Sequence, residues 1–327
     1  MLFLLLPLAG CSSPAYAGPP PAAGAASRSG GEVRLWQDAA IFALVSSLIA
    51  GARHRVSVEM YELGRGDIVV SLGAARARGV EVRVITDPTV SASRKSAVRL
   101  RSLGVAQEPY PVDDRRHQID HVKLLIADGV AAVGGMNWGA HSGRNHDYVL
   151  ETHIAADVGR LARIFEQDWN LASGHPAPLG MEAGEIAQTS PGDEIRRMLS
   201  AALAGATHRV LAEVYTLTDP EIIVDLVRAH RRGADVRVLL DPNQAYNVHS
   251  DAILRAGGVA VRWYPVPRGV LLHAKIGLFD GELILGSANW TRSGLGVNHE
   301  LDIETEDPQA IAAYGSRFES DWARSAA

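Results

Sequence analysis

The sequence predicts an α/β fold made of two homologous lobes. An internal repeat relates the second half of the chain to the first, and within each half short strand-like runs alternate with segments of helical spacing. The 327 residues suffice for about two domains of about 150 residues each. With 47% hydrophobic and 21% charged residues, the composition excludes collagen-like, coiled-coil and wholly disordered chains.

The repeat has an offset of 154 residues over most of its length. It sets the predicted boundaries, which are a leader and flexible tether over 1–32, one lobe over 33–173, a linker rich in Gly, Pro and Ala over 174–189, and a second lobe over 190–327. We expect the lobes to pack as an intramolecular pseudo-dimer within one monomer. Matching residues include Glu59 and Glu213, Tyr61 and Tyr215, Gly79 and Gly233, and Asp87-Pro88 and Asp241-Pro242.

The elements of each lobe follow from its apolar spacing. In the first lobe we expect a strand over 56–61, a helix over 68–78 and a strand over 80–85. Strands that alternate with helices indicate a largely parallel sheet covered by helices in each lobe. The second lobe repeats these elements at 210–215, 222–232 and 236–240.

The first 31 residues have the features of an export signal. The apolar run Leu2–Leu8 leads into Leu-Ala-Gly-Cys11, which resembles the box at which bacterial lipoprotein leaders are cleaved before a lipidated cysteine. An ordinary secretory leader that ends near Ala15 or Ala17 stays the alternative. No Lys or Arg precedes the apolar run, which favours a start codon further upstream. Residues 12–31 predict a flexible tether, so we expect an exported protein, secreted or anchored by lipid at the cell envelope.

A histidine and a lysine, two residue types that can take part in catalysis, recur as a pair in the two lobes. His121 and Lys123 are two residues apart, as are His273 and Lys275, so each pair lies on one face of a strand. The chain has only three lysines, and Lys95 is the third. Because arginine is used almost everywhere else, lysine at both motifs indicates a need for a compact ammonium charge.

Each of these strands is predicted to continue into a hairpin. Asp128 and Asp280 are each followed by glycine, and Asp-Gly between two apolar runs is typical of a two-residue turn. We therefore expect a structural role for both aspartates. Asn137 and Asn289 each follow their histidine by 16 residues, so one hairpin in each lobe can present His, Lys and Asn together.

This duplicated pattern resembles the phospholipase D superfamily, whose mark is a repeated His-x-Lys-x4-Asp motif followed by Gly-Ser-x-Asn. The resemblance covers both lobes from about residue 33 to the end, and it implies two phospholipase D-like α/β lobes. The second copy keeps the serine as Ser287, whereas the first copy has Gly135 in its place. The loss of that hydroxyl removes one phosphate donor and leaves the His and Lys positions intact.

The resemblance also implies the roles of individual residues. His121, in the first copy, is the expected nucleophile, and His273 is the expected general acid and base. Asp147 and Glu300 follow their motifs at matching places, and each is expected to orient the histidine of the other lobe. His146 and His299 also repeat, and the sequence leaves open whether they contact substrate or cap a loop.

The residue types suit hydrolysis of a phosphodiester. Its negative charge repels nucleophiles, so cations and hydrogen-bond donors are needed around the nonbridging oxygens. Lys123 and Lys275 would supply the charges, and Asn137, Asn289 and Ser287 would supply donors. We expect neither a metal nor another cofactor, because a lysine beside each histidine would repel a metal cation.

These features favour an exported phosphodiesterase of the phospholipase D type. The expected partner is a phospholipid at a membrane surface, either hydrolysed or transphosphatidylated, because export and a net charge of −5 favour lipid over polyanionic DNA. Three alternatives remain, namely an exported endonuclease of the same superfamily with nucleic acid as its substrate, a cardiolipin synthase-like phosphatidyltransferase, and a non-catalytic binding module of the same fold.

Overall fold

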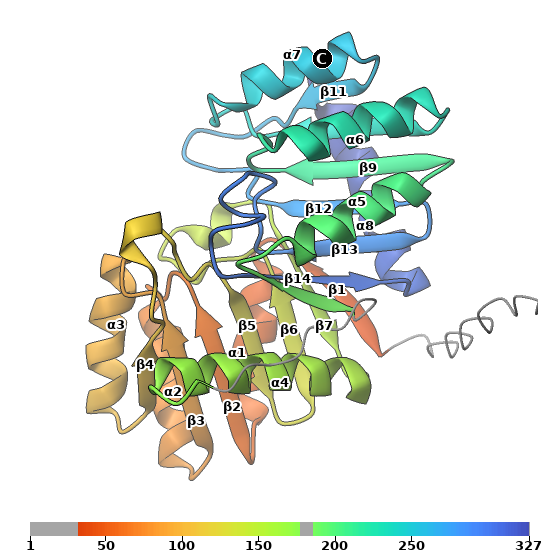
Figure 1. The fold of residues 1–327 in the computed structure, drawn as a ribbon. Helices are drawn as coiled ribbons and strands as arrows, with labels where there is room; N and C mark the ends of the chain where they lie inside the picture. The colour runs from red at the N-terminus through yellow and green to blue at the C-terminus, as the bar shows by residue number, and fades with distance from the viewer. Residues whose placement is uncertain (1–31, 177–185, 327) are drawn as a thin grey trace, which may run out of the picture.

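A computed structural model describes residues 32–176 and 186–326 of the chain. Two mixed sheets, each of seven strands and each covered by helices, lie side by side (Figure 1). This confirms the prediction of two α/β lobes packed as a pseudo-dimer. Cys11, the leader and the tether lie outside the described residues, so export and lipidation stay predictions.

The first lobe contains seven strands and four long helices, all within the described residues. The predicted helix over 68–78 and the predicted strands over 56–61 and 80–85 are confirmed to within two residues. The elements are β1 (Val33–Gln37), α1 (Ala40–Gly51), β2 (Arg55–Met60), α2 (Gly66–Ala77), β3 (Glu81–Thr86), α3 (Ser91–Ser102), β4 (Ala106–Pro109), β5 (Lys123–Ala127), β6 (Val130–Gly134), β7 (Tyr148–Thr152) and α4 (Ala155–Ala172).

The second lobe repeats this order, and its three predicted elements are likewise confirmed. Residues 187–189 of its first strand fall inside the predicted linker over 174–189, whereas the structure pairs residues 187–190 with the edge of the second sheet. The elements are β8 (Ala187–Ser190), α5 (Glu194–Gly205), β9 (Arg209–Val214), α6 (Pro220–Arg231), β10 (Asp235–Leu240), α7 (Asn247–Ala256), β11 (Ala260–Trp263), β12 (Lys275–Phe279), β13 (Glu282–Gly286), β14 (Glu300–Thr305) and α8 (Pro308–Arg324).

The two sheets have equivalent strand orders, β1-β7-β6-β5-β2-β3-β4 and β8-β14-β13-β12-β9-β10-β11. Only the β2–β3–β4 and β9–β10–β11 pairings are parallel, and the remaining pairings are antiparallel. The prediction of a largely parallel sheet is therefore wrong. The reason is the Asp-Gly turn, because two residues between β5 and β6, and between β12 and β13, can only join antiparallel neighbours.

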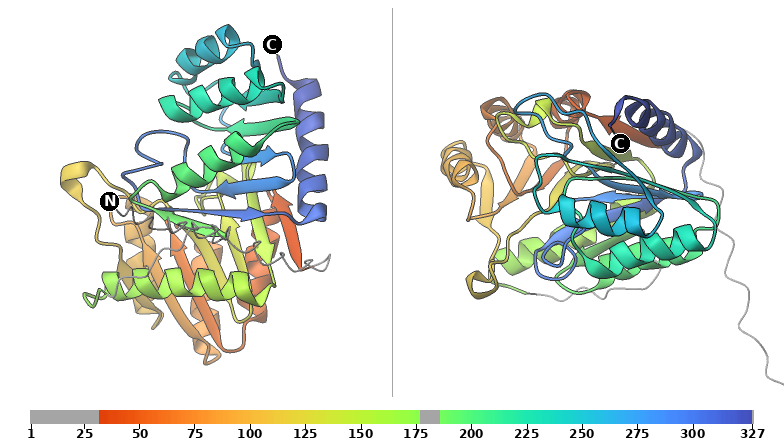
Figure 2. Two further views of the ribbon diagram at one scale, coloured as in Figure 1. Left: turned by 45° about the vertical axis from the view of Figure 1, so that its right-hand side comes forward. Right: turned by 90° about the horizontal axis from the view of Figure 1, so that it is seen from above.

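A hydrophobic core shared by both lobes holds the sheets together. It includes Leu124 of β5, Ile276 of β12, Phe165 of α4 and Phe318 of α8, all fully buried or nearly so. Figure 2 shows α8 standing along the side of the second sheet, where it also packs against β1 of the first lobe. In the described part of the chain, no helix combines the length and the apolar character that crossing a bilayer requires.

Candidate active site

The equivalent hairpins of the two lobes place each His-x-Lys pair at the start of a strand. Lys123 is the first residue of β5 and Lys275 the first residue of β12. At the far end of these strands, Asp128 and Asp280 occupy left-handed turn positions with φ of 50° and 52°. The Asp128 carboxylate accepts hydrogen bonds from the backbone N–H groups of residues 53–55, and Asp280 accepts from those of residues 207–209. Both aspartates therefore brace the turn, as expected, far from the histidines.

Each motif histidine is bound by a carboxylate of the opposite lobe. His121 Nδ1 lies 2.8 Å from Glu300 Oε2, and His273 Nδ1 lies 2.7 Å from Asp147 Oδ2. An imidazole whose Nδ1–H donates to a carboxylate keeps its lone pair on Nε2. Both rings therefore present Nε2 as the reactive nitrogen, and neither lobe can complete this arrangement alone.

Main-chain hydrogen bonds join the lobes beside the same histidines. The His121 N–H donates to the carbonyl of His299 at 2.7 Å, and the His273 N–H donates to the carbonyl of His146 at 2.8 Å. These bonds restrain the backbone of each motif histidine. The position of the rings therefore depends on the lobe interface as well as on their own strands.

The two motif lysines are buried and carry perturbed pKa values. Lys123 is 3% exposed and Lys275 is 2% exposed, and each ammonium contacts the carbonyl oxygen of its own motif histidine. Burial lowers the pKa of Lys123 to about 7 and that of Lys275 to about 8. Nearby carboxylates, with Glu300 and Asp147 first among them, oppose the shift. An anionic ligand beside these two lysines would therefore favour their charged forms.

The charges of both motif lysines act on each motif histidine. Burial, and after it the charges of Lys123 and Lys275, holds the pKa of His121 well below its ordinary value of 6.5. Burial and the neighbouring Lys275 lower the pKa of His273 to about 4, with Asp147 opposing. The lysine of each lobe acts on the histidine of the other, so four charged or titratable groups converge on one region.

The predicted phosphate donors take different positions. Asn137 and Asn289 lie at equivalent, half-buried places, and the side-chain oxygen of each is buried without a hydrogen-bond partner among the described residues. Ser287 is fully buried, and its hydroxyl donates to Glu300 Oε2 at 2.5 Å. Ser287 therefore binds the carboxylate that contacts His121, and its role as a phosphate donor stays a prediction. Sequence reasoning missed Asn298, which donates to the other Glu300 oxygen at 3.0 Å.

The structure explains why Gly135 replaces serine in the first copy. A Cβ atom at residue 135 would lie 2.3 Å from Asp147 Oδ1 and 3.0 Å from Asp147 Cγ. The second copy pairs Ser287 with the longer Glu300, whose carboxylate lies further from its own backbone. In each lobe the hairpin residue and the acid must therefore fit together in the same limited space. The first lobe combines Gly135 with Asp147, and the second combines Ser287 with Glu300.

We predict that Gly135→Ser lowers kcat/KM by about 10²-fold, because the new side chain displaces Asp147 and misaligns His273. Gly135→Ser combined with Asp147→Glu reproduces the second copy and should recover most of the activity. Gly129→Ser is the matched control, since nothing lies within 4 Å of a Cβ atom there. Steady-state kinetics on a soluble phosphodiester checks all three variants. Equal activity of Gly135→Ser and Gly129→Ser would contradict the steric explanation.

The repeated histidines His146 and His299 are buried, at 3% and 2% exposure, and the side chain of each lies in an ionic cluster between the lobes. His299 Nε2 lies 3.1 Å from Asp168 Oδ2 and 3.3 Å from Glu59 Oε1, both from the first lobe. Its ring stacks on Tyr110 at 4.4 Å. Although burial opposes the charge, Asp168 and Glu59 hold the pKa of His299 well above its ordinary value.

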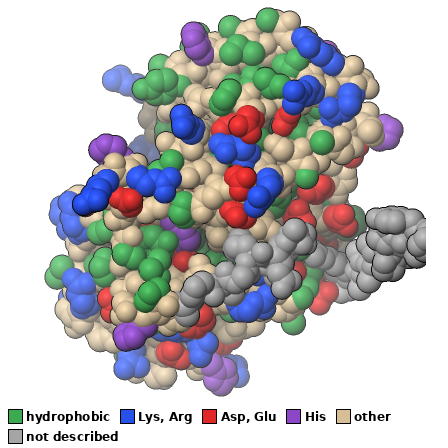
Figure 3. Space-filling view, in the orientation of Figure 1, with side chains coloured by type: hydrophobic (Ala, Val, Ile, Leu, Met, Phe, Trp, Pro, Cys, Tyr) green, Lys and Arg blue, Asp and Glu red, His purple; other side chains and the backbone are tan. Residues whose placement is uncertain are grey.

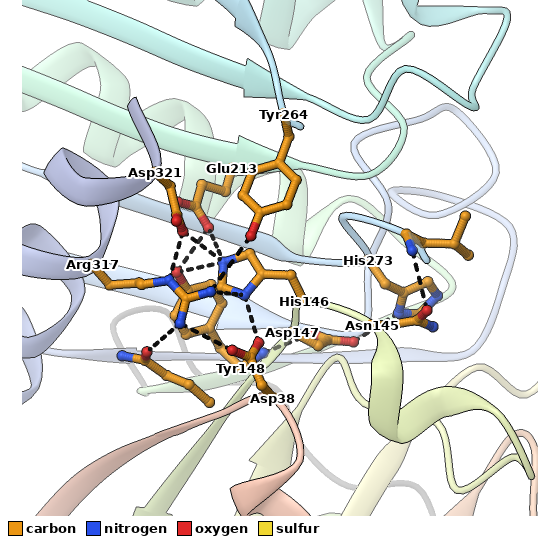
Figure 4. A network of polar contacts seen from close by, with 12 residues as sticks. Asp38, Asn145, His146, Asp147, Tyr148, Glu213, Tyr264, His273, Arg317 and Asp321 are labelled. Atoms are coloured by element: carbon orange, nitrogen blue, oxygen red, sulfur yellow. Dashed lines mark hydrogen bonds and ion pairs between the residues drawn. The ribbon is translucent and has the colours of Figure 1, made fainter. Parts of the chain in front are cut away.

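His146 occupies the equivalent cluster on the other side of the interface (Figure 4). Its Nδ1 lies 2.6 Å from Asp38 Oδ1, and its Nε2 lies 3.0 Å from Glu213 Oε2 and 3.2 Å from Asp321 Oδ2. Arg317 of α8 joins the same carboxylates with bonds to Asp38 and Asp321. Burial opposes ionisation, but the carboxylates raise the pKa of His146 well above its ordinary value.

These two clusters are also where the described residues bring potential metal ligands together. In each group, carboxylate and imidazole atoms lie within 4.8 Å of one another. A histidine with a raised pKa already pairs with the carboxylates in both groups, so we describe them as ion clusters. The groups are Glu59, Asp120 and His299, and His146, Glu213 and Asp321.

Comparison with known proteins defines the class. A family model described as cardiolipin synthase, PLD-like domain, matches the chain twice, over residues 45–169 and 199–322. These matches cover more than half of the chain and include both His-x-Lys pairs. The chain therefore belongs to this family within the phospholipase D superfamily, a class of phosphodiesterases and phosphotransferases.

Individual relatives are similar over long stretches. A mitochondrial cardiolipin hydrolase of Chlamydomonas reinhardtii is 28% identical over 71% of this chain and 97% of its own length. A probable cardiolipin synthase of Bacillus subtilis is 25% identical over 79% of this chain, and the match spans 58% of that protein.

Solved structures share the fold. Phosphatidylserine synthase of Haemophilus influenzae superposes with a TM-score of 0.68 at 11% identity, over 89% of this chain and 85% of its own. Polyphosphate kinase of Porphyromonas gingivalis superposes with a TM-score of 0.65 at 16% identity, over 88% of this chain and 50% of its own. At such low sequence identity, these structures support the two-lobed fold and nothing about function.

Proposed function

We propose that the chain is a metal-independent phosphodiesterase of the phospholipase D type that acts on phospholipids through a phosphohistidine. One observation carries the proposal. His121 and His273 each bind a carboxylate of the opposite lobe through Nδ1 and stand beside two buried lysines. The phospholipid substrate is supported by the relatives named cardiolipin hydrolase and cardiolipin synthase.

The first chemical step forms a covalent intermediate. With its Nδ1–H bound to Glu300, His121 uses the Nε2 lone pair to attack phosphorus. An N–P bond forms while the P–O bond to the leaving alcohol breaks. His273, protonated on Nε2 and held by Asp147, gives its proton to the leaving oxygen. Lys123 and Lys275 stabilise the charge that develops on the nonbridging oxygens.

The second step reverses these roles. Neutral His273 takes a proton from an incoming hydroxyl group, and the oxygen of that group attacks phosphorus. The N–P bond breaks, and His121 returns to its neutral form. Water as the acceptor yields a phosphomonoester, whereas an alcohol yields a new phosphodiester. The same residues therefore support hydrolysis and transphosphatidylation, and the acceptor decides the product.

Substrate charge is needed to set the protonation states of this mechanism. Burial, chiefly, lowers the pKa of His273 to about 4 and that of Lys123 to about 7. A phosphodiester anion placed between the two lysines would favour their charged forms and that of His273. Binding of the substrate thus prepares the general acid.

We predict that kcat/KM for a soluble phosphodiester falls as the pH rises, between about pH 6 and pH 9. Protonated His273 and Lys123 are required, and both are lost as the pH rises above pKa values of about 4 and about 7. The pKa of His121 is lowered too, so its neutral form persists in mild acid. A pH series of kcat/KM, which reports the free enzyme, checks the direction. A rate that increases toward alkaline pH would contradict these assignments.

A substrate panel tests the proposed function. Phosphatidylcholine, phosphatidylglycerol, cardiolipin and single-stranded DNA should be assayed side by side, with and without EDTA. We expect phosphatidate or a transphosphatidylated product from lipid, no cleavage of DNA, and the same rate in EDTA. Cleavage of DNA alone would replace the proposal by the nuclease alternative. Loss of activity in EDTA would overturn the metal-free mechanism.

The proposal includes export of the enzyme. It is supported by the apolar run Leu2–Leu8 and the Leu-Ala-Gly box before Cys11. Fractionation of cells that express the full chain, compared with Cys11→Ser, separates the two export routes. A lipid anchor predicts that only the wild type stays with the membrane, and an ordinary leader predicts that both are secreted.

A further inference from the structure

Two helices flank the active site at equivalent places, α3 in the first lobe and α7 in the second. Ser93 in the first turn of α3 donates to the carbonyl of Tyr61 at 2.7 Å, and Asn247 at the start of α7 donates to the carbonyl of Tyr215 at 2.9 Å. Tyr61 and Tyr215 each pack against a motif histidine, with ring centroids 4.8 Å apart. Each helix therefore begins one hydrogen bond away from a residue of the site.

The surface of α3 is basic. Its sequence over residues 91–102 contains four basic residues and no acidic residue. Arg94, Lys95, Arg99 and Arg101 are all exposed, and Lys95 is the one lysine of the chain outside the motifs. In Figure 3, Lys and Arg side chains line the left edge of the first lobe, where α3 lies. This helix is suited to contact with anionic groups.

The surface of α7 is apolar instead. A groove of about 660 Å³ runs between α6 and α7 and begins at Thr218, whose N–H donates to the carbonyl of Trp290 beside Asn289. Hydrophobic side chains are visible over these helices (Figure 3). Four of the six large hydrophobic side chains exposed among the described residues line this groove. They are Tyr246, 73% exposed, Val248, 61%, Ile253, 50%, and Val224, 43%.

We propose that these two helices dock the chain on an anionic phospholipid bilayer, with the α6–α7 groove taking an acyl chain and α3 contacting headgroup phosphates. The proposal rests on the proposed function, since it supplies the surface from which that site would receive its substrate. An apolar groove and a cationic helix on the two flanks of one site match the two chemical parts of such a lipid. Binding at a bilayer surface grows with buried apolar area and with attraction of Lys and Arg to anionic lipids.

A second copy of the chain is a poorer occupant of the groove. Pairing through the groove would bury the apolar side chains but would leave the basic face of α3 without a role. The bilayer accounts for both surfaces at once. Tyr246, the most exposed of the four, has an apolar ring and a polar hydroxyl, which is the side-chain type that concentrates at membrane interfaces.

Vesicle binding tests the docking surface. Full-length His121→Ala protein, which cannot consume the lipid, is sedimented with vesicles of phosphatidylcholine alone or mixed with phosphatidylglycerol. In this background, Tyr246→Ser/Val248→Ser/Ile253→Ser should weaken binding to both vesicles by about tenfold. Lys95→Glu/Arg99→Glu should weaken binding by about tenfold for the anionic vesicles alone, and less at high salt.

Matched controls lie elsewhere on the surface. Val70→Ser changes a valine that is 58% exposed at the position of α2 equivalent to Val224, and Arg53→Glu/Arg209→Glu reverses two exposed charges at the opposite end of the sheets. Both controls should bind vesicles like the parent protein. Unchanged binding of the groove and α3 variants, or equal losses in the controls, would overturn the proposal. So would sedimentation analysis showing that the groove variants abolish a dimer while vesicle binding persists.

Turnover of a soluble diester separates this proposal from the proposed function. With His121 restored, the groove and α3 variants should hydrolyse bis(p-nitrophenyl) phosphate at the wild-type rate. If the chain binds vesicles as described but cleaves no phospholipid, the proposed function fails and the docking surface stands. If it cleaves dispersed short-chain phospholipid while the variants bind vesicles normally, the docking surface fails and the proposed function stands.

Discussion

Replacing either His121 or His273 with alanine should lower kcat by at least about 10⁴-fold, to the residual rate that binding and electrostatics support. In the proposed mechanism, His121→Ala removes the nitrogen that attacks phosphorus, and His273→Ala removes the group that moves the proton in both steps. Since each ring is held by an acid of the opposite lobe, neither histidine has a substitute within reach. Steady-state kinetics on a soluble diester measures both losses.

A good leaving group distinguishes the two histidines. With a p-nitrophenyl ester, His273→Ala should still release one equivalent of p-nitrophenol per site and then stop, because departure of this leaving group needs no acid. His121→Ala should give no burst. Quenching of a reaction with labelled phosphate in alkaline denaturant should leave the label on the peptide that contains His121, because the N–P bond of a phosphohistidine is stable in base. A label on the peptide of His273 would reverse the two assignments.

His54→Ala and His208→Ala are the matched controls. These histidines also form a repeated pair, but they are exposed at the opposite end of the sheets from the motif histidines. Their removal should leave the rate unchanged. A comparable loss of activity in the controls would show that the assay reports folding and not catalysis.

Replacing His299 with alanine should destabilise the protein by about 3–5 kcal/mol, because buried carboxylates lose their cationic partner. Glu59 and Asp168 are fully buried, and several of their oxygens have no hydrogen-bond partner among the described residues. His146→Ala should cost less, since Arg317 remains in its cluster. The corresponding residue of the first lobe is Ile164, which carries no charge.

Urea unfolding of the wild type, His146→Ala, His299→Ala and the exposed control His208→Ala checks this order. The pKa of His299 is raised in the folded protein, so its stabilising contribution is complete below the unfolded pKa and is lost as the pH rises through the folded one. The difference in unfolding free energy between wild type and His299→Ala should therefore shrink at alkaline pH. A difference that does not change with pH would mean that His299 is neutral.

Much of the fold could be predicted from local patterns. The spacing of apolar residues and the turn residues at either end predict the strand over 80–85 and the helix over 68–78. The repeat predicts the same two elements in the second lobe. The parallel arrangement was wrong because alternation of element types says nothing about the direction of strands joined by short turns. The Asp-Gly turn at Asp128 already implied an antiparallel pair, and it should have outweighed the alternation.

The edge strand β8 shows a different limit. Residues 187–190 have no strong strand pattern and follow a stretch rich in Gly and Pro, so composition assigned the first three of them to a linker. Their partner is β14, more than a hundred residues further along the chain. The repeat carried the missing signal, since β1 of the first lobe lies at the equivalent place, at the edge of its sheet.

For the site, the spacing within the motifs predicted which histidines and lysines belong to it. It did not predict the hydrogen bonds and ion pairs that surround them. Asn298 and the buried acid Glu59 have counterparts in the repeat, Asn145 and Glu213, but a repeated polar residue in a sequence gives no indication of which groups it will contact or how deeply it will be buried. The sequence shows His146 and His299 as a repeated pair. Only the structure, which buries both among carboxylates, identifies them as members of ionic clusters and not as substrate contacts.

The amino-acid order alone established which groups could react: a doubled imidazole and ammonium pair, each on its own hairpin, within a duplicated α/β chain. Tertiary packing decided which acid serves which ring, why glycine stands at residue 135, and how raised and lowered pKa values divide among neighbouring histidines. The physical reason is the distance along the chain over which each effect acts. Strand periodicity and turn chemistry act over a few residues, whereas burial and charge depend on segments that meet only when the lobes have packed together.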